Sequence, residues 1–115
     1  MSNIRGVGID IEEARRFRNP SFQKQPSFYQ KIFTTAEIRY CLSKEHPYRH
    51  FAARFAAKEA ILKCLRSTIY KIRDIEIMNN KKGAPSVKVK GRTGKFLISM
   101  SHTRDHGAAI AIWLN

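Results

Sequence analysis

The sequence has few acidic residues, little cysteine and no long apolar run. Nine Asp and Glu residues stand against 22 Lys and Arg, so the 115-residue chain carries a formal net charge of +13. No stretch of about 18 apolar residues is present, and the sequence therefore predicts no membrane-spanning helix. The N-terminus, MSNIRGVGIDIEE, becomes acidic too early for a secretory signal peptide. No repeat, low-complexity segment or linker divides the chain, so we expect one domain over residues 1–115.

The two cysteines indicate neither a metal site nor a redox pair. Cys41 and Cys64 lack the spacing of zinc ligands, and both lie in apolar helical patterns. We expect buried free thiols, which are typical of a reducing compartment, and therefore predict a cytoplasmic protein.

The excess of positive charge indicates an anionic partner, because unneutralised cations repel one another. Nucleic acid, an acidic membrane surface, a phosphorylated small molecule and an acidic protein all fit this description. The basic residues are spread along the chain among apolar residues, as in ARRFR and YRHFAARF, so they belong to folded elements rather than to a disordered arm.

The hydrophobic pattern near the N-terminus predicts a strand. Residues 3–11, NIRGVGIDI, alternate and are rich in β-branched side chains. Gly6 and Gly8 within this strand indicate either a close approach of another backbone or a bulge. Asp10 points to the face opposite Ile9, because successive side chains of a strand alternate.

The rest of the chain predicts two main helices followed by four strands. Thr34 and Glu37 form a capping-box pattern for a helix over residues 35–43. A longer helix begins at Pro47 and ends near Leu65. The strands are expected at residues 70–78, 86–90, 95–101 and 107–114. This order predicts an α+β domain in which a long helix packs on an antiparallel sheet.

Polar side chains interrupt the apolar patterns at three places. Asp10 and Glu12 share one face of the first strand. Glu59 and Lys63 lie one turn apart beside the apolar stripe of the long helix, and Ser99, Ser101 and His102 end a strand. Each also has an ordinary structural explanation. Asp10 fits a solvated sheet face, and Glu12 fits an acid in the first turn of a helix. Glu59 and Lys63 fit an i,i+4 salt bridge contributing about 0.2–0.5 kcal/mol, and His102 fits a residue that bonds its own turn.

Together the three places fit phosphoryl-transfer or phosphodiester chemistry. Two carboxylates on rigid elements suit a hard divalent cation such as magnesium, whose other ligands are water and phosphate oxygens. A nearby lysine adds a positive charge for a phosphate. Serine hydroxyls and a histidine can bond or deprotonate further groups.

Three ordered blocks carry a resemblance to a known family. They are VGIDIEEARRF, then FAARFAAKEAILKCL about 40 residues later, then ISMSHTRDHGAAIAIW. Gly-x-Asp, Lys-Glu-Ala-x-x-Lys and Ser-x-Ser-His, in this order and in a chain of this length, resemble a 4′-phosphopantetheinyl transferase of the short holo-acyl-carrier-protein synthase type. The resemblance implies the α+β fold of that family and transfer of phosphopantetheine from coenzyme A to a serine of a carrier protein, with release of adenosine 3′,5′-bisphosphate.

The resemblance also implies roles for matching residues. Asp10 and Glu59 match magnesium ligands, and Glu12 is a possible third ligand because the longer two-lobed transferases carry Asp-x-Glu. The predicted catalytic residues are Glu59, Lys63 and His102, with Glu59 acting as a base through a water molecule. The predicted cofactor-binding residues are Arg54, Lys58, Lys63, Ser101 and His102. The short enzymes form trimers with each active site at a subunit interface, so we expect a homotrimer.

In this interpretation the net positive charge of the chain complements both partners, because carrier proteins are typically acidic and coenzyme A is polyanionic. The basic segment Arg15, Arg16 and Arg18, directly after the first strand, is where we expect the carrier protein to dock.

The sequence departs from the family pattern in the loop after the long helix. The short enzymes usually have a glycine-rich loop there, whereas this chain has Arg66-Ser67-Thr68-Ile69-Tyr70. Cys64 stands where alanine is usual. Two other functions stay open at this point. One is a basic nucleic-acid-binding module, which the pI of about 10.3 favours. The other is an inactive homologue that binds coenzyme A without transfer.

Overall fold

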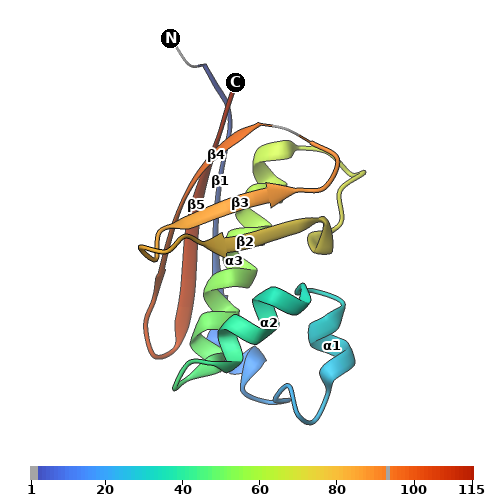
Figure 1. Cartoon of the computed structure of the whole chain (residues 1–115), viewed down its shortest axis with the longest axis vertical. Coiled ribbons are helices and arrows are strands. Elements are labelled where there is room, and N and C mark those ends of the chain that lie inside the picture. Colours follow the sequence, from blue (N-terminus) through green and yellow to red (C-terminus); the bar gives the residue numbers. More distant parts are fainter. Residues whose placement is uncertain (1–2, 93) are drawn as a thin grey trace.

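A single long helix organises the fold, with a sheet on one side and a β-hairpin on the other (Figure 1). The computed structural model describes residues 3–92 and 94–115. The helix is α3 (Pro47–Leu65). The sheet has the antiparallel order β1 (Ile4–Glu13), β5 (His106–Leu114) and β4 (Lys95–His102), and the hairpin pairs β2 (Ile75–Asn79) with β3 (Pro85–Val89). The predicted α+β class, with a long helix on an antiparallel sheet, is confirmed.

Short helices complete the lower part of the molecule in Figure 1. They are η1 (Ala14–Phe17), α1 (Pro26–Gln30) and α2 (Thr35–Leu42), and a further turn, η2 (Ile72–Asp74), precedes β2. The predicted capping box at α2 is present: Thr34 Oγ1 accepts from Glu37 N, and Glu37 Oε1 accepts from Thr34 N at 2.8 Å. None of the helices within the described ranges is both long and apolar enough to cross a bilayer.

Two details differ from the sequence prediction. The four C-terminal strands do not form one sheet, because β4 and β5 pair with β1 while β2 and β3 form a separate pair. The predicted strand over residues 70–78 starts only at Ile75. A turn precedes it, stabilised where Asp74 Oδ2 accepts a hydrogen bond from Lys71 N at 2.8 Å.

Main-chain contact sets the distance between α3 and the sheet. A Cβ atom added at Gly8 would lie 1.9 Å from the carbonyl oxygen of Ala60, and one at Gly6 would lie 2.4 Å from that of Cys64. The close approach predicted from these glycines is confirmed, and a bulge is also present between Ile4 and Gly6. The helix therefore covers the face of β1 that carries Asp10, and the isoleucines of β1 face outward.

The core consists of two apolar clusters along α3. The C-terminal half of the helix packs between the sheet and the hairpin, with Cys64 buried there; Cys41 is buried as well, and both thiols are free, as predicted. The N-terminal half packs against aromatic rings from η1 and α1. Tyr29 anchors this second cluster, since its hydroxyl donates to the carbonyl oxygens of Phe17 and Pro20 at 2.7 Å. This packing fixes η1 beside the end of β1.

Candidate active site

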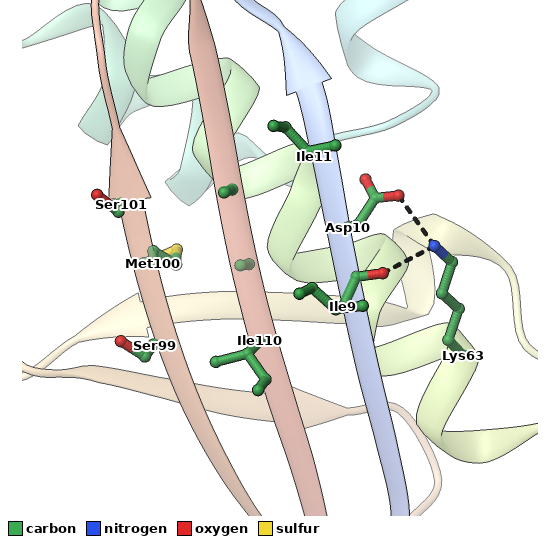
Figure 2. Close-up of a pocket in the computed structure, with 10 residues that line it drawn as sticks. Ile9, Asp10, Ile11, Lys63, Ser99, Met100, Ser101 and Ile110 are labelled. Atoms are coloured by element: carbon green, nitrogen blue, oxygen red, sulfur yellow. Dashed lines mark hydrogen bonds and ion pairs between the residues drawn. The ribbon is translucent and has the colours of Figure 1, made fainter.

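Lys63 joins the polar face of β1 to α3. Its Nζ lies 3.1 Å from Asp10 Oδ1 and donates to the carbonyl oxygen of Ile9 at 2.8 Å (Figure 2). Glu59, one turn earlier on α3, is not the ion-pair partner of Lys63 in the described part of the chain. The lysine therefore forms an interaction between two elements rather than an ordinary i,i+4 pair on the helix surface.

Negative charge is crowded around Asp10. Its second oxygen, Oδ2, is buried and has no hydrogen-bond partner among the described residues. Burial, reinforced by interaction with Asp10, raises the pKa of Glu12 to about 7, although Arg16 acts in the opposite direction. Burial and the Asp10 charge also raise the pKa of Glu59, opposed by Lys63 and Arg16. A bound cation would relieve this repulsion and give Asp10 Oδ2 a partner.

The carboxylates fit a magnesium ion whose other ligands come from water and from a bound phosphate compound. Among residues 3–92 and 94–115, no group of three or more His, Cys, Asp or Glu side chains is arranged to hold a metal ion alone. Asp10 and Glu59 suit an incomplete site, because Mg²⁺ usually keeps several waters and takes one or two carboxylates plus phosphate oxygens. Glu12 is already engaged, since Arg16 Nη1 donates to its Oε1 at 2.8 Å.

A second group of predicted residues lies beside a small cavity elsewhere on the helix. Arg54 and His102 line this cavity, which has a volume of about 160 Å³. The Arg54 guanidinium lies 4.0 Å from the centre of the Tyr40 ring, and its Nε is buried without a partner among the described residues. His50, which the sequence analysis missed, has its ring centre 4.8 Å from that of His102. Its position four residues before Arg54 on α3 was the available signal.

The two groups of predicted residues do not meet within one chain. Arg54 and Glu59 are five residues apart on α3, which separates them by roughly 140° around the helix axis at 3.6 residues per turn. Asp10 and His102 lie on β1 and β4, with β5 between them, so their strands are roughly 10 Å apart. One ligand could therefore contact both groups only by extending around the helix or between two copies of the chain.

Of the other two predicted cofactor-binding residues, Lys58 lies outside both groups and Ser101 lies apart from the His102 cavity. The side chain of Lys58 is fully buried, and its Nζ donates to Glu37 Oε1 at 2.6 Å and to the carbonyl oxygen of Ile32 at 2.7 Å. With no exposed atom, Lys58 does not fit the predicted role in cofactor binding. Ser101 pairs with Ala108 on the outer face of the sheet and borders the groove that Asp10 and Lys63 also line, whereas His102 is directed to the opposite face.

The outer face of the sheet is apolar and exposed. The exposed fractions are 53% for Val7, 66% for Ile9, 65% for Ile11 and 42% for Ile110. These side chains are far from the core, and three of them border a groove of about 590 Å³ that Asp10 and Lys63 also line (Figure 2). Contiguous exposed apolar surface of this kind marks an interaction site in soluble proteins.

The basic segment at η1 divides into two parts. Arg16 belongs to the carboxylate group through Glu12 and lies 4.9 Å from the centre of the Phe55 ring. Arg15 and Arg18 are exposed, with Arg15 paired to Glu13 and Arg18 lying 4.3 Å from the centre of the Tyr48 ring.

The loop after α3 shows how the chain replaces the missing glycine. Arg66 ends the helix with φ 52° and ψ 30°, the left-handed conformation that glycine adopts most easily. Ile69 of the same loop is 77% exposed. The chain therefore keeps the left-handed helix end that favours glycine, with an arginine in it.

Comparisons with known proteins agree with this geometry. Residues 6–112 match the family model of the 4′-phosphopantetheinyl transferase superfamily. The holo-[acyl-carrier-protein] synthase of Thermodesulfovibrio yellowstonii is 38% identical over 95% of this chain and 97% of the relative, and that of Chlamydia caviae is 41% identical over 94% and 95%. The fold is similar to the crystal structure of a holo-(acyl-carrier-protein) synthase from Bacillus anthracis in complex with CoA (3′,5′-ADP), with a TM-score of 0.82, 26% identity and 97% of each chain covered. It is also similar to the Plasmodium yoelii enzyme, with a TM-score of 0.80, 28% identity, and 100% of this chain and 98% of that chain covered.

Proposed function

This chain belongs to the 4′-phosphopantetheinyl transferase superfamily, and we propose that it is a holo-acyl-carrier-protein synthase. It transfers 4′-phosphopantetheine from coenzyme A to a serine hydroxyl of an apo acyl carrier protein. The observation that carries this proposal is the crowded carboxylate group of Asp10 and Glu59 with Lys63 beside it, in a chain whose relatives over nearly its whole length are holo-acyl-carrier-protein synthases.

The transfer is a substitution at phosphorus. The serine oxygen forms a new bond to the phosphorus that carries pantetheine, the bond from that phosphorus to the bridging oxygen breaks, and adenosine 3′,5′-bisphosphate leaves with the bridging oxygen. Asp10 and Glu59 would hold magnesium, which would neutralise charge on the pyrophosphate. Lys63 is placed to add a second positive charge near the leaving group.

Glu59 is the base in this proposal. It takes the serine proton through a water molecule. Its raised pKa supports the role, because a base works best when its pKa lies close to the operating pH. Arg16 lowers the pKa of both Glu59 and Glu12, and so helps to keep these carboxyls ionised.

Arg54 and His102 bind the anionic end of coenzyme A in this proposal. The Arg54 side chain lines the cavity that His102 also lines, and its buried Nε has no hydrogen-bond partner among the described residues. Because this cavity is separated from Asp10 by the width of α3, we assign the two halves of one active site to two copies of the chain. The protein is then a homotrimer with shared sites, in which the exposed apolar face of the sheet is covered by a neighbouring copy.

The carrier protein docks on η1 in this proposal. Arg15 and Arg18 present exposed positive charge immediately after the strand that carries Asp10, so an acidic helix bound there would have its serine close to the carboxylate group.

Mass spectrometry tests the function directly. The protein is incubated with coenzyme A, magnesium and a panel of apo acyl carrier proteins, and we expect one carrier to gain the mass of one phosphopantetheine group. Glu45→Gln, which changes an exposed carboxylate in the turn before α3, is the matched control for Glu59→Gln, which should abolish the gain. Binding of coenzyme A without any transfer to the panel would identify an inactive homologue and refute the proposal.

A further inference from the structure

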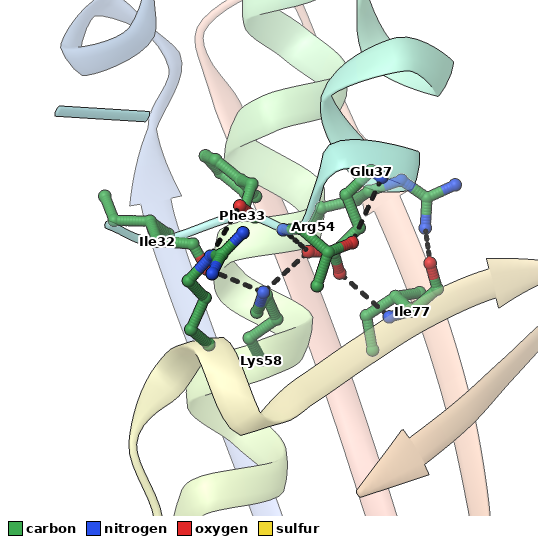
Figure 3. A network of polar contacts seen from close by, with 8 residues as sticks. Ile32, Phe33, Glu37, Arg54, Lys58 and Ile77 are labelled. Atoms are coloured by element: carbon green, nitrogen blue, oxygen red, sulfur yellow. Dashed lines mark hydrogen bonds and ion pairs between the residues drawn. The ribbon is translucent and has the colours of Figure 1, made fainter. Parts of the chain in front are cut away.

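A buried polar network connects α2, α3 and β2 (Figure 3). Its three charged members are almost fully covered, with exposed fractions of 1% for Glu37, 3% for Arg54 and 0% for Lys58. Burying three charges is costly unless they are paired or hydrogen-bonded, and every polar side-chain atom of the three except Arg54 Nε has a hydrogen-bond partner among the described residues. The Glu37 carboxylate is at its centre: Oε1 accepts from Lys58 Nζ at 2.6 Å and from Thr34 N at 2.8 Å.

The other oxygen of Glu37 leads to Arg54 through one residue of β2. Glu37 Oε2 accepts from Ile77 N at 2.8 Å, and the carbonyl oxygen of Ile77 accepts from Arg54 Nη1 at 3.2 Å. Arg54 Nη2 donates to Asn79 Oδ1 on the same strand. Ile77 is thus held through its N–H by Glu37 and holds Arg54 through its carbonyl oxygen.

The guanidinium of Arg54 is also supported from α2. It lies 4.0 Å from the centre of the Tyr40 ring, and Tyr40 is one turn after Glu37 on that helix. A long arginine side chain ordinarily loses much conformational freedom when it binds a ligand, and a side chain already fixed avoids that cost. Two of its nitrogens are occupied by β2, Nε is buried without a hydrogen-bond partner among the described residues, and the side chain lines the cavity that His102 also lines.

We propose that Glu37 is a positioning residue for coenzyme A binding: it holds Ile77 of β2, which in turn fixes Arg54 in the orientation that receives the anionic end of coenzyme A. This inference rests on the proposed function, in which Arg54 is a coenzyme A ligand. Lys58 Nζ donates to Glu37 Oε1 at 2.6 Å, and so supports the arrangement without contacting the cofactor.

Glu37→Gln tests the proposal because it changes one oxygen to a donor with almost no change in volume. The amide cannot accept from Ile77 N and from Lys58 and Thr34 at the same time. We expect the dissociation constant of coenzyme A, measured by calorimetry, to rise roughly tenfold, as for loss of a hydrogen bond to a charged group. The KM for the carrier protein and the magnesium concentration for half-maximal rate should not change. Glu76→Gln, the same chemical change at the preceding residue of β2, should leave coenzyme A affinity as it is.

A double-mutant cycle with Arg54→Lys shows whether the effect passes through Arg54. In the Arg54→Lys background, Glu37→Gln should weaken coenzyme A binding no further, because the group that it positions is already changed. Equal weakening in both backgrounds overturns the positioning role. No effect of Arg54→Lys alone overturns the assignment of Arg54 within the proposed function, which is a separate result.

A paired variant covers the case in which Glu37→Gln does not fold. Glu37→Gln with Lys58→Met removes both buried charges together and ends the competition of Lys58 Nζ for the amide oxygen, so that this oxygen can accept from Ile77 N in place of Thr34 N. We expect this variant to fold, as judged by circular dichroism. Its dissociation constant for coenzyme A should lie within about threefold of that of the unaltered protein, a difference below one kcal/mol, because Ile77 is again held through its N–H. A folded paired variant that has lost its coenzyme A affinity contradicts the proposal.

Discussion

Asp10→Asn changes the charge of the carboxylate group while keeping its shape. The amide can still accept from Lys63 Nζ, which lies 3.1 Å from Oδ1 in the unaltered protein, but it removes the negative charge that a magnesium ion needs. Loss of such a ligand should cost about 4 kcal/mol of the barrier, which corresponds to a rate reduced on the order of 10³-fold.

The same substitution should leave the fold intact. The Asp10–Lys63 pair contributes about 0–1 kcal/mol to stability because the lysine side chain is half exposed. Against this loss stands the removal of repulsion between Asp10 and its neighbours Glu12 and Glu59. We therefore expect the free energy of unfolding to change by less than about 1 kcal/mol, and the pKa of Glu12 to fall from about 7 toward its ordinary value.

Three measurements on one variant check this reasoning. Steady-state rates give the loss of transfer, urea unfolding gives the stability, and carboxyl-resolved NMR titration gives the pKa of Glu12. Near-normal turnover would refute the assignment of Asp10 as a metal ligand. A large loss of stability together with the loss of activity would show that Asp10 is structural instead.

Four further predictions concern other parts of the molecule. Ile9→Glu places a charge on the exposed apolar face and should convert a trimer of active subunits into inactive monomers, seen by light scattering; a fully active monomer of the unaltered chain contradicts the shared site. Arg15→Glu with Arg18→Glu should raise the KM for the carrier protein and flatten the fall of rate with salt, while the KM for coenzyme A stays constant; the reverse pattern would make these arginines cofactor ligands. Arg66→Gly should stabilise the protein by about 1 kcal/mol in urea unfolding, because glycine adopts the left-handed conformation without strain, and any destabilisation speaks against strain at this helix end. Burial and the charge of His102 lower the pKa of His50 to about 4, so protonation of His50 disfavours the folded state and the free energy of unfolding should fall as the pH drops from about 6.5 toward 4. His50→Phe should reduce this dependence of stability on pH, and an unchanged dependence would assign it to other groups.

Sequence patterns predicted elements better than they predicted partners. The bounds of α3 and its relation to a sheet followed from Pro47, the apolar stripe and the change of period after Leu65. The separation of the β2–β3 hairpin from the sheet did not follow, because pairing of strands depends on contacts between residues that are distant in the chain. In the same way, Lys63 was expected near Glu59 along the helix, yet its ion pair is with Asp10 on another element.

Lys58 shows most clearly where prediction of a residue's role from its motif fails. Its place beside Glu59 in the motif predicted a role at the cofactor, since neighbouring residues in a motif are easily given one function. On a helix, adjacent residues point about 100° apart. Glu59 faces the Asp10 side, whereas Lys58 is buried against Glu37, and only the position of α2 reveals that partner. Of these two neighbours, Lys58 belongs to the buried network, and only Glu59 keeps a role in the mechanism that we propose.

The main-chain contact between β1 and α3 determines which amino-acid substitutions this site can tolerate. In most helix–sheet pairs, side chains act as spacers, so replacing a leucine with a valine shifts the two layers relative to each other. Here the carbonyl of Ala60 lies against Gly8, so the layers touch through main-chain atoms that every amino acid shares. Substitutions elsewhere in the core therefore leave the distance between Asp10 and Glu59 unaltered. Gly8→Ala, which adds a single methyl group, forces β1 and α3 apart. The distance between the two carboxylates that we propose as magnesium ligands is thus insensitive to most core substitutions and is lost at once by a substitution of Gly8.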